Sequence, residues 1–180
     1  MTIILSVPPT ERAAGLRLRP WDFDDLPSLV AAHRDPDLRR WLATSLADAA
    51  QARNWLEAQA IGWADATRFS FAVVEDDDRS IVGHVAVKVA GADAAEVGYW
   101  TAAHARGRGV AARALAAVSR WALAEQDMVR LTRLELLHAV DNRASCRVAH
   151  KCGFILHELL PPAPPEFPGD GHRHVRTTGG

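Results

Sequence analysis

The sequence predicts a single domain of the α+β (mixed α/β) class, with a central mixed, mostly antiparallel sheet of six to seven strands flanked by about four to five helices. Its 180 residues are enough to bury one core, and 48% hydrophobic with 24% charged residues is ordinary for a globular protein. Apolar residues follow helical spacing up to about residue 64, and period-two patterns follow. A later strand–loop–helix–strand unit predicts one parallel crossover.

The first third of the chain is expected to be mainly helical. Residues 1–15 are expected to be a loose leader. Alternation in Leu16–Arg19 predicts a short strand, which Pro20 ends. Apolar residues at helical spacing then predict three helices, which begin after Asp22 or Asp24, at Asp35-Pro36, and at Leu46 after Ser45, the last running to about Ala64.

The middle of the chain predicts three strands followed by a helix. Alternating apolar residues form two runs joined by an acidic turn, which is typical of a hairpin. The predicted strands cover residues 69–74, 81–89 and 95–101, and the helix covers Val110 to Glu125.

The last third repeats the strand–helix pattern. A strand over 131–137 precedes a helix that Asp141-Asn142 caps and Gly153 ends, and a strand over 154–160 follows. A Pro-rich loop and a candidate edge strand near 172–178 complete the chain. The expected divisions are therefore a leader (1–15), the main domain (16–160), and a Pro-rich loop with a last strand of the same domain (161–180).

Composition excludes several classes of function. The formal net charge is −1, so no global positive field attracts nucleic acid or an acidic membrane. The N-terminus lacks a basic region followed by a long apolar run, so no signal peptide is expected. Cys146 and Cys152 are six residues apart, which suits neither a redox pair nor a zinc knuckle, and predicts reduced thiols in a cytoplasmic protein. We expect a monomer or homodimer without nucleic-acid or membrane partners.

Metal binding is also not expected. His172 and His174 form a His-x-His pair that could hold a metal ion, but the sequence shows no third ligand beside them. The prediction is therefore that no metal takes part.

The segment between the third strand and the following helix predicts an anion site. Helix N-termini carry unpaired N–H groups and partial positive charge, and glycines let the backbone approach a ligand closely. The residues expected to cradle a pyrophosphate are Arg106, Gly107, Arg108, Gly109, Val110 and Ala111. The loop has neither the G-x-G-x-x-G pattern of dinucleotide folds nor the Gly-Lys-Ser/Thr of a P-loop.

These residues resemble a known family. Arg106 to Ala111 is similar to the Q/R-x-x-G-x-G/A signature with which GNAT N-acetyltransferases grip the pyrophosphate of acetyl-CoA. Asn142 to Ser145, followed by Gly153-Phe154, resembles the N-x-x-S…G-F helix of the branch that contains the ribosomal-protein N-terminal (alanine/serine) acetyltransferases. The opening and central strand of that branch also resemble two stretches here, Leu18–Leu26 and Glu96–Trp100. The resemblance covers about residues 16–160.

The resemblance implies a GNAT-like fold and an acetyl-CoA-dependent N-acetyltransferase. Such an enzyme moves an acetyl group to a primary amine by direct transfer in a ternary complex. Acetyl-CoA would be the co-substrate, with Asn142 contacting it while capping its helix. Trp100 and Thr101, at the splayed end of the central strand, would supply backbone groups to the pantetheine and the thioester carbonyl. The alternative is a non-catalytic acyl-CoA-binding regulatory or interaction module.

The catalytic groups are less directly indicated. Glu96 is the candidate base, directly or through water, because several family members place a glutamate there and desolvation in a cleft would make it a better base. His84 competes for this role or is a core histidine. Many members carry a tyrosine at the position of Ala149, but the chain's one tyrosine, Tyr99, lies on the central strand. The resemblance therefore gives Ser145 the role of proton donor to the leaving thiolate.

The acceptor amine stays open at this point. A protein N-terminus, an aminoglycoside-like drug, a polyamine and an amino acid all fit the pattern. An acidic lining of the acceptor cleft would favour a polycationic amine.

Overall fold

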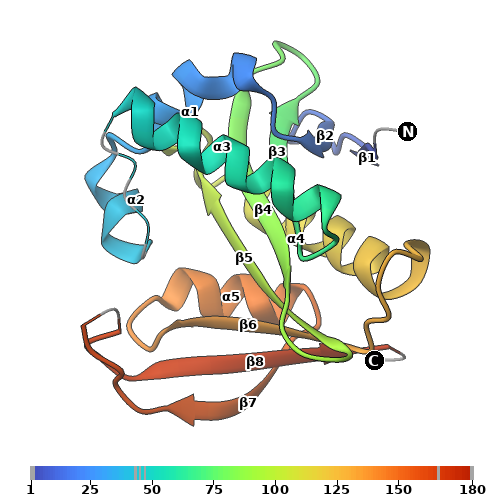
Figure 1. Cartoon of the computed structure of the whole chain (residues 1–180), viewed down its shortest axis with the longest axis vertical. Helices are drawn as coiled ribbons and strands as arrows, with labels where there is room; N and C mark the ends of the chain where they lie inside the picture. The colour runs from blue at the N-terminus through green and yellow to red at the C-terminus, as the bar shows by residue number, and fades with distance from the viewer. Residues whose placement is uncertain (1–2, 43, 45, 47, 166, 179–180) are drawn as a thin grey trace.

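The computed structural model describes residues 3–42, 44, 46, 48–165 and 167–178. These residues form one eight-stranded sheet in the order β1-β2-β3-β4-β5-β6-β8-β7 (Figure 1). All neighbouring strands are antiparallel except β5 and β6. The strands are β1 (Leu5–Val7), β2 (Leu16–Pro20), β3 (Arg68–Glu75), β4 (Ile81–Val89), β5 (Ala94–Thr101), β6 (Arg133–Ala139), β7 (Ile155–Leu160) and β8 (Gly171–Thr177).

Five α-helices flank the sheet, as expected. They are α1 (Leu26–Ala32), α2 (Pro36–Trp41), α3 (Ala49–Ala64), α4 (Val110–Arg120) and α5 (Arg143–Lys151), with short helical turns at η1 (Phe23–Asp25), η2 (Ala103–Ala105) and η3 (Trp121–Glu125). The third helix begins later than predicted because Asp48 caps it by accepting a hydrogen bond from the Gln51 N–H. Ser45, expected to precede that helix, lies outside the described residues. None of the described helices is long and apolar enough to cross a membrane.

The segment expected to be a loose leader contains the first strand, which raises the strand count above six to seven. Leu5 lies opposite Leu18, so β1 and β2 form a hairpin. The Arg113 guanidinium of α4 donates hydrogen bonds of 2.8 Å to the carbonyl oxygens of Pro8 and Ala14 in the hairpin loop. A three-residue strand is too short to show a period-two pattern, so only the pairing reveals it.

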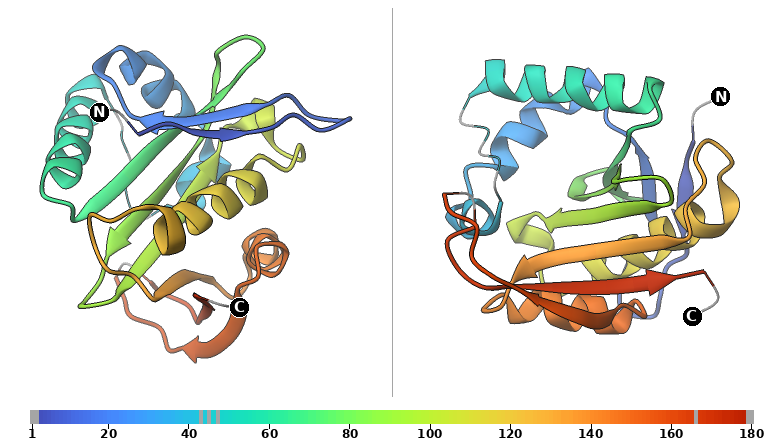
Figure 2. Two further views of the ribbon diagram at one scale, coloured as in Figure 1. Left: turned by 90° about the vertical axis from the view of Figure 1, so that its right-hand side faces the viewer. Right: turned by 60° about the horizontal axis from the view of Figure 1, so that its bottom comes forward.

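The last strand lies inside the sheet, so the expectation of an edge strand is wrong. β8 pairs with β6 on one side and with β7 on the other. The edge position falls to β7, whose residues are nearly all exposed. The connection through α5 places β7 one strand away from β6, and the chain then turns back so that β8 runs antiparallel between them (Figure 2).

Two apolar clusters lie on opposite faces of the sheet. The larger lies between the strands and α4, where the rings of Trp63, Phe69, Phe71 and Trp121 pack edge to face at 5.1–5.3 Å, apart from the more tilted Trp63–Trp121 pair. The smaller cluster gathers residues of α1, α2 and α3 around Trp100. Side chains of a strand alternate between faces, so β5 contributes Val97 to the first cluster and Trp100 to the second.

The parallel strands β5 and β6 separate at their C-terminal ends. They pair from Ala94 opposite Arg133 to Val97 opposite Leu136, and then diverge, although both strands continue (Figure 1). The Ala102 N–H bonds to the Val82 carbonyl of the β4 side. Backbone groups alternate in direction along a strand, so the N–H and C=O groups of Tyr99 and Thr101 face the opening towards β6.

Candidate active site

The loop before α4 presents an uncapped helix N-terminus. Gly107 and Gly109 both have φ of +75°, a backbone conformation that glycine adopts without strain. Gly109 is the N-cap residue and offers no side chain, and the Arg113 N–H is the amide that bonds to its carbonyl. The N–H groups of the first turn, Val110 to Ala112, therefore have no partner within the helix. This arrangement suits a phosphate group.

The two loop arginines are already paired with carboxylates. Arg106 bonds to Asp35 and lies 3.4 Å from Asp37, both at the start of α2. Arg108 bonds to Glu75 at the end of β3. The sequence placed both arginines in the cradle but did not reveal these ion pairs, which connect the loop to α2 and β3.

The second helix N-terminus lies across the opening between β5 and β6. The Asn142 side-chain oxygen accepts a hydrogen bond of 3.1 Å from the Ser145 N–H, so the predicted N-cap of α5 is confirmed. Ser145 occupies the first turn of this helix.

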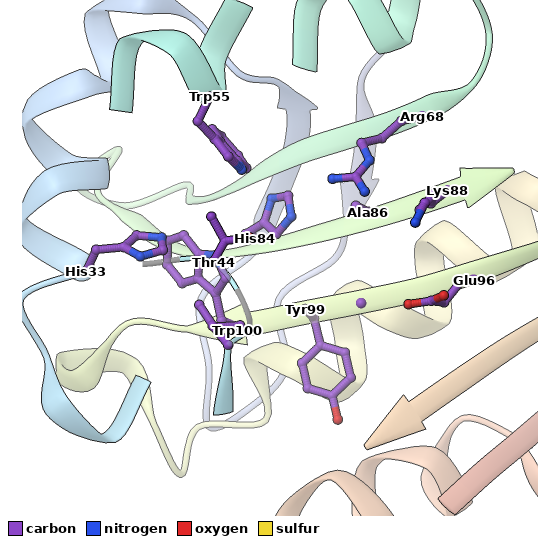
Figure 3. A pocket seen from close by; sticks show the side chains of 12 residues that line it. His33, Thr44, Trp55, Arg68, His84, Ala86, Lys88, Glu96, Tyr99 and Trp100 are labelled. Carbon is purple, nitrogen blue, oxygen red and sulfur yellow. The ribbon is translucent and has the colours of Figure 1, made fainter. Parts of the chain in front are cut away.

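Tyr99 lies beside Ser145, an arrangement that the sequence did not reveal. Its side chain points away from the helices of the opposite face (Figure 3). Burial raises the pKa of Tyr99 to about 12, and the neighbouring Ser145 hydroxyl lowers it only in part. The buried hydroxyl has no partner of good hydrogen-bond geometry among the described residues. Tyr99 therefore keeps its proton at neutral pH and has hydrogen-bonding capacity to spare.

A cavity of about 170 Å³ opens on the face of β5 that carries α1 and α3. Aromatic residues form one part of its wall, and charged residues of three adjacent strands form another (Figure 3). Arg68 of β3 lies opposite Lys88 of β4, which lies opposite Glu96 of β5. The lining residues are His33, Leu42, Thr44, Trp55, Arg68, His84, Ala86, Lys88, Glu96, Gly98, Tyr99 and Trp100.

Glu96 stands in this cavity but is exposed. The desolvation that was expected to strengthen it as a base is absent. Two cations and one carboxylate line the cavity, so it does not have the acidic character that a polycationic amine would need. No described lining residue other than Glu96 carries a carboxylate.

His84 has the properties of a core histidine. Its Nδ1 accepts a hydrogen bond of 3.0 Å from the Trp21 indole N–H. Burial, and then the nearby positive charge of Arg68, lowers the pKa of His84 to about 3. An imidazole with an occupied lone pair and so low a pKa is a poor base, so the competing assignment loses its support.

The predicted residues fall into two groups on opposite sides of the sheet. Glu96 and Trp100 belong to the cavity face, whereas Ser145 and the loop from Arg106 to Ala111 belong to the side of α4 and α5. Between the two groups, β5 and β6 stop pairing after Val97 and Leu136. The carbonyl oxygen of Trp100 points towards β4, where it lies close to Gly83. A Cβ atom added to Gly83 would be only 2.6 Å from this oxygen. The free edge therefore belongs to Thr101, as expected, and to Tyr99, which the prediction missed.

Tyr99 could have been found from the sequence by one step of alternation. Side chains alternate along a strand, so Tyr99 lies on the face of β5 opposite to that of Glu96 and Trp100. Only the divergence of β5 and β6, however, brings the hydroxyls of Tyr99 and Ser145 together.

A family model for the GNAT acetyltransferase domain matches residues 15–155. The chain therefore belongs to the GNAT acetyltransferase family. No curated protein matches the sequence significantly.

Solved structures share the fold over nearly the whole chain. A putative ribosomal-protein-serine acetyltransferase from Vibrio cholerae superposes with a TM-score of 0.77 at 24% identity, over 96% of this chain and 97% of that one. RimJ from Mycobacterium smegmatis in complex with a CoA disulfide gives 0.81 at 22% identity, over 98% and 87%. The microcin C7 self-immunity acetyltransferase MccE, with acetyl-CoA and AMP, gives 0.78 at 17% identity, over 93% and 97%. Two of these relatives thus hold a form of the cofactor.

Proposed function

We propose that this protein is a cytoplasmic N-acetyltransferase that moves an acetyl group from acetyl-CoA to a primary amine by direct transfer in a ternary complex. The observation that carries the proposal is that β5 and β6 stop pairing after Val97 and Leu136, with the uncapped N-terminus of α4 on one side of the sheet and the cavity on the other. A thioester lying where these strands diverge meets an amine that arrives from the cavity.

The cofactor binds along the α4 side. The pyrophosphate accepts hydrogen bonds from the first-turn amides of α4, with Arg106 and Arg108 at its flanks. The pantetheine extends along the free edge of β5, where Tyr99 and Thr101 offer backbone groups. Asn142 stands at the start of α5 and keeps its amide N–H₂ available while its oxygen caps the helix.

The chemistry needs a base, an oxyanion partner and a proton donor. The neutral amine attacks the carbonyl carbon, and its surplus proton passes to Glu96, directly or through water. Backbone N–H groups at the β5 edge stabilise the developing oxyanion. As the carbon–sulfur bond breaks, the thiolate takes a proton from the Ser145 hydroxyl, which regains a proton from solvent; the Tyr99 hydroxyl lies beside Ser145.

The acceptor is a primary amine of a small molecule or of a protein N-terminus. Arg68 and Lys88 beside Glu96 favour an amine that carries an acidic or polar group, and Trp55 and Trp100 favour an apolar part. Polyamines are disfavoured, because two like charges would face them.

The proposal is tested by turnover against a panel of amines that includes peptides, amino acids and polyamines. We expect CoA release with matching acetylated product, and no acetyl adduct on the protein when the amine is omitted. Glu96→Gln and Ser145→Ala should lose turnover and keep acetyl-CoA affinity. Tight cofactor binding without CoA release across the panel would instead support the non-catalytic binding module. Failure to bind millimolar acetyl-CoA would contradict both.

A further inference from the structure

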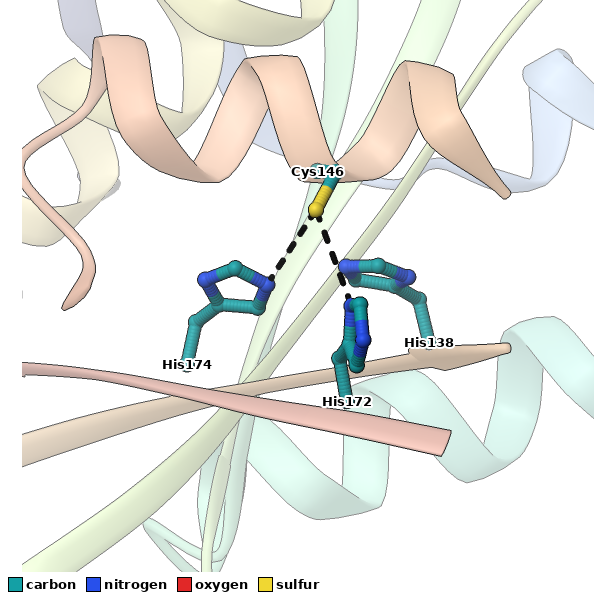
Figure 4. A group of neighbouring side chains, drawn as sticks. All are labelled: His138, Cys146, His172 and His174. Atoms are coloured by element: carbon teal, nitrogen blue, oxygen red, sulfur yellow. Dashed lines mark hydrogen bonds between the residues drawn. The ribbon is translucent and has the colours of Figure 1, made fainter. Parts of the chain in front are cut away.

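Four side chains that the acetyl-transfer site does not use converge beneath α5. We call them the His–Cys cluster: His138 of β6, Cys146 of α5, and His172 and His174 of β8. Each offers one donor atom, and these atoms all lie within 4.8 Å of one another (Figure 4). His174 is fully buried and the other three are partly exposed, so the cluster is enclosed but can be reached from solvent.

The fold explains why these residues meet. His138 lies directly opposite His172 in the antiparallel pair of β6 and β8. His174 is two residues further along β8 and therefore projects to the same face. Helix α5 covers this face and points the sulfur of Cys146 between the rings (Figure 4). The sequence showed only the His-x-His pair, because the other two ligands come from different elements.

The distances agree with tetrahedral coordination. The Cys146 sulfur lies 3.6 Å from His172 Nδ1 and 3.7 Å from His174 Nε2. In a tetrahedral zinc site, with bonds of about 2.3 Å to sulfur and about 2.0–2.1 Å to nitrogen, the sulfur and a nitrogen are about 3.6 Å apart. Two of the ligand pairs thus already have the required spacing, and a pair at the full 4.8 Å needs to close by about 1.2–1.5 Å.

His138 supplies an independent observation. Its Nδ1 lies 2.8 Å from the Ala139 carbonyl oxygen, which can only accept, so Nδ1 carries the hydrogen and Nε2 carries a lone pair. That Nε2 is buried and has no partner among the described residues. A ligand histidine whose other nitrogen donates to a carbonyl is the usual arrangement around a protein-bound metal.

We propose that the His–Cys cluster is a four-coordinate site for Zn²⁺. Imidazole and thiolate together suit zinc, and four protein ligands leave no open position, as in structural rather than catalytic sites. Cys146 binds as the thiolate, so one proton passes to solvent for each ion bound, whereas the histidines bind in their neutral form. The ion would hold α5 against β6 and β8, and the proposal therefore differs from the expectation that no metal takes part.

The test uses tag-free, full-length protein and does not depend on acetyl transfer. Protein stripped with a chelator and titrated with Zn²⁺ should bind one equivalent tightly. Replacement with Co²⁺ should give a sulfur-to-cobalt charge-transfer band together with the intense visible bands of tetrahedral cobalt. Cys146→Ser should abolish the charge-transfer band, and both Cys146→Ser and His138→Asn should weaken Zn²⁺ binding at least tenfold.

Matched variants separate the cluster from other thiols and imidazoles. His157→Asn changes an exposed histidine of β7, and Cys152→Ser changes the other cysteine, so both should bind Zn²⁺ like the wild type. In the wild-type protein, Zn²⁺ should slow the reaction of Cys146 with a thiol-reactive disulfide. The proposal is overturned if the stripped protein binds less than half an equivalent, if Cys146→Ser keeps the wild-type affinity, or if the Co²⁺ form shows no sulfur band. Those results would leave a hydrogen-bonded thiol–imidazole cluster.

Discussion

The two faces of β5 are built in different ways. On the side of α4 and α5, the groups come from two compact segments, Arg106–Ala111 and Asn142–Ser145, each at the start of a helix. On the opposite side, the cavity is lined by residues that follow α1 and α2 and by residues of α3, β3, β4 and β5. The groups on the first side are close together in the sequence and are positioned by helix termini. The cavity on the second side forms only when residues far apart in the sequence pack together. Under the proposed function, the first binds the invariant cofactor and the second binds the variable acceptor.

This difference predicts which kinetic parameter each face controls. Changes on the α4 and α5 side should alter cofactor affinity or the chemical step. Changes on the cavity side should alter acceptor KM and the pH dependence. Four experiments examine that division, in order of decreasing effect.

The largest effect is expected from the paired hydroxyls. Ser145→Ala should lower kcat about 100-fold, which is the lower end of what a proton donor contributes. Tyr99→Phe should lower it less, and the double variant should not be much slower than Ser145→Ala, because the two act as one unit. Steady-state kinetics with an active amine measure both effects. Equal losses in acetyl-CoA affinity would show that these residues bind cofactor instead.

The next effect concerns His84, which lines the cavity, and the pH dependence that it gives to the free energy of unfolding. The pKa of His84 is about 3 in the folded protein, below its ordinary 6.5. Below pH 6.5, His84 is protonated in the unfolded chain but stays neutral in the folded protein. The stability that His84 contributes is therefore present above pH 6.5 and is lost as the pH falls towards 3, by up to about 1.4 kcal/mol per pH unit.

Replacing His84 should remove this loss. In His84→Asn, the amide oxygen can still accept from Trp21, while the titrating group is gone. Urea unfolding between pH 4 and 7 should show a flatter decline than in the wild type, by about one proton. His157→Asn is the matched control, since that histidine is exposed, and it should keep the wild-type slope. An unchanged slope in His84→Asn would show that the folded protein accommodates a charged His84.

The third effect separates backbone strain from cofactor binding. Gly109→Ala forces a side chain into φ of +75°, which costs about 1 kcal/mol, and it disturbs the amides at the start of α4. We expect acetyl-CoA affinity to fall about tenfold, the equivalent of one charge-assisted hydrogen bond. Gly153→Ala has nearly the same φ of +74° and similar open space, but lies after α5. Gly153→Ala should lower the free energy of unfolding by the same amount and leave acetyl-CoA affinity unchanged, and calorimetry can measure both. If Gly153→Ala lowered acetyl-CoA affinity as much as Gly109→Ala, backbone strain alone would explain the loss.

The smallest effect is expected at the cap of α5. Asn142→Ala removes the acceptor of the Ser145 N–H and should lower the free energy of unfolding by about 1 kcal/mol. Asn142→Asp keeps that acceptor and should be nearly neutral for stability. If Asn142→Asp binds acetyl-CoA more weakly, the loss is due to the missing amide N–H₂ group, because the helix cap is still present. Equal stability in all three proteins would show that α5 does not depend on this cap.

The predictability of the molecule follows the same division. The strands, α4 and the cap at Asn142 could be predicted because their signals are local: alternation, a Gly-rich turn, and an Asn three residues before a Ser. The strand β1 could not, since three residues in a leader show no periodicity. The interior position of β8 depends on the connection through α5, which places β7 one strand away from β6, and no local pattern encodes this.

Candidate site residues could be named from the sequence where local motifs mark them, but contacts between separate elements could not. Gly109 and Ser145 were identified from motifs. The pairing of Arg106 with Asp35, the burial of His84 and the proximity of Tyr99 to Ser145 all required the packed structure. The expectation that Glu96 is desolvated was wrong because the cavity stays open above it.

Acetyl-CoA is proposed to lie where β5 and β6 diverge, with its pyrophosphate at the N-terminus of α4. A crystal structure of the protein with CoA would decide this. We expect pyrophosphate oxygens within hydrogen-bond distance of the amides of Val110 to Ala112, pantetheine along the Tyr99–Thr101 edge, and the sulfur next to Ser145. The proposed position of acetyl-CoA would be contradicted if CoA bound elsewhere and no part of it lay between β5 and β6.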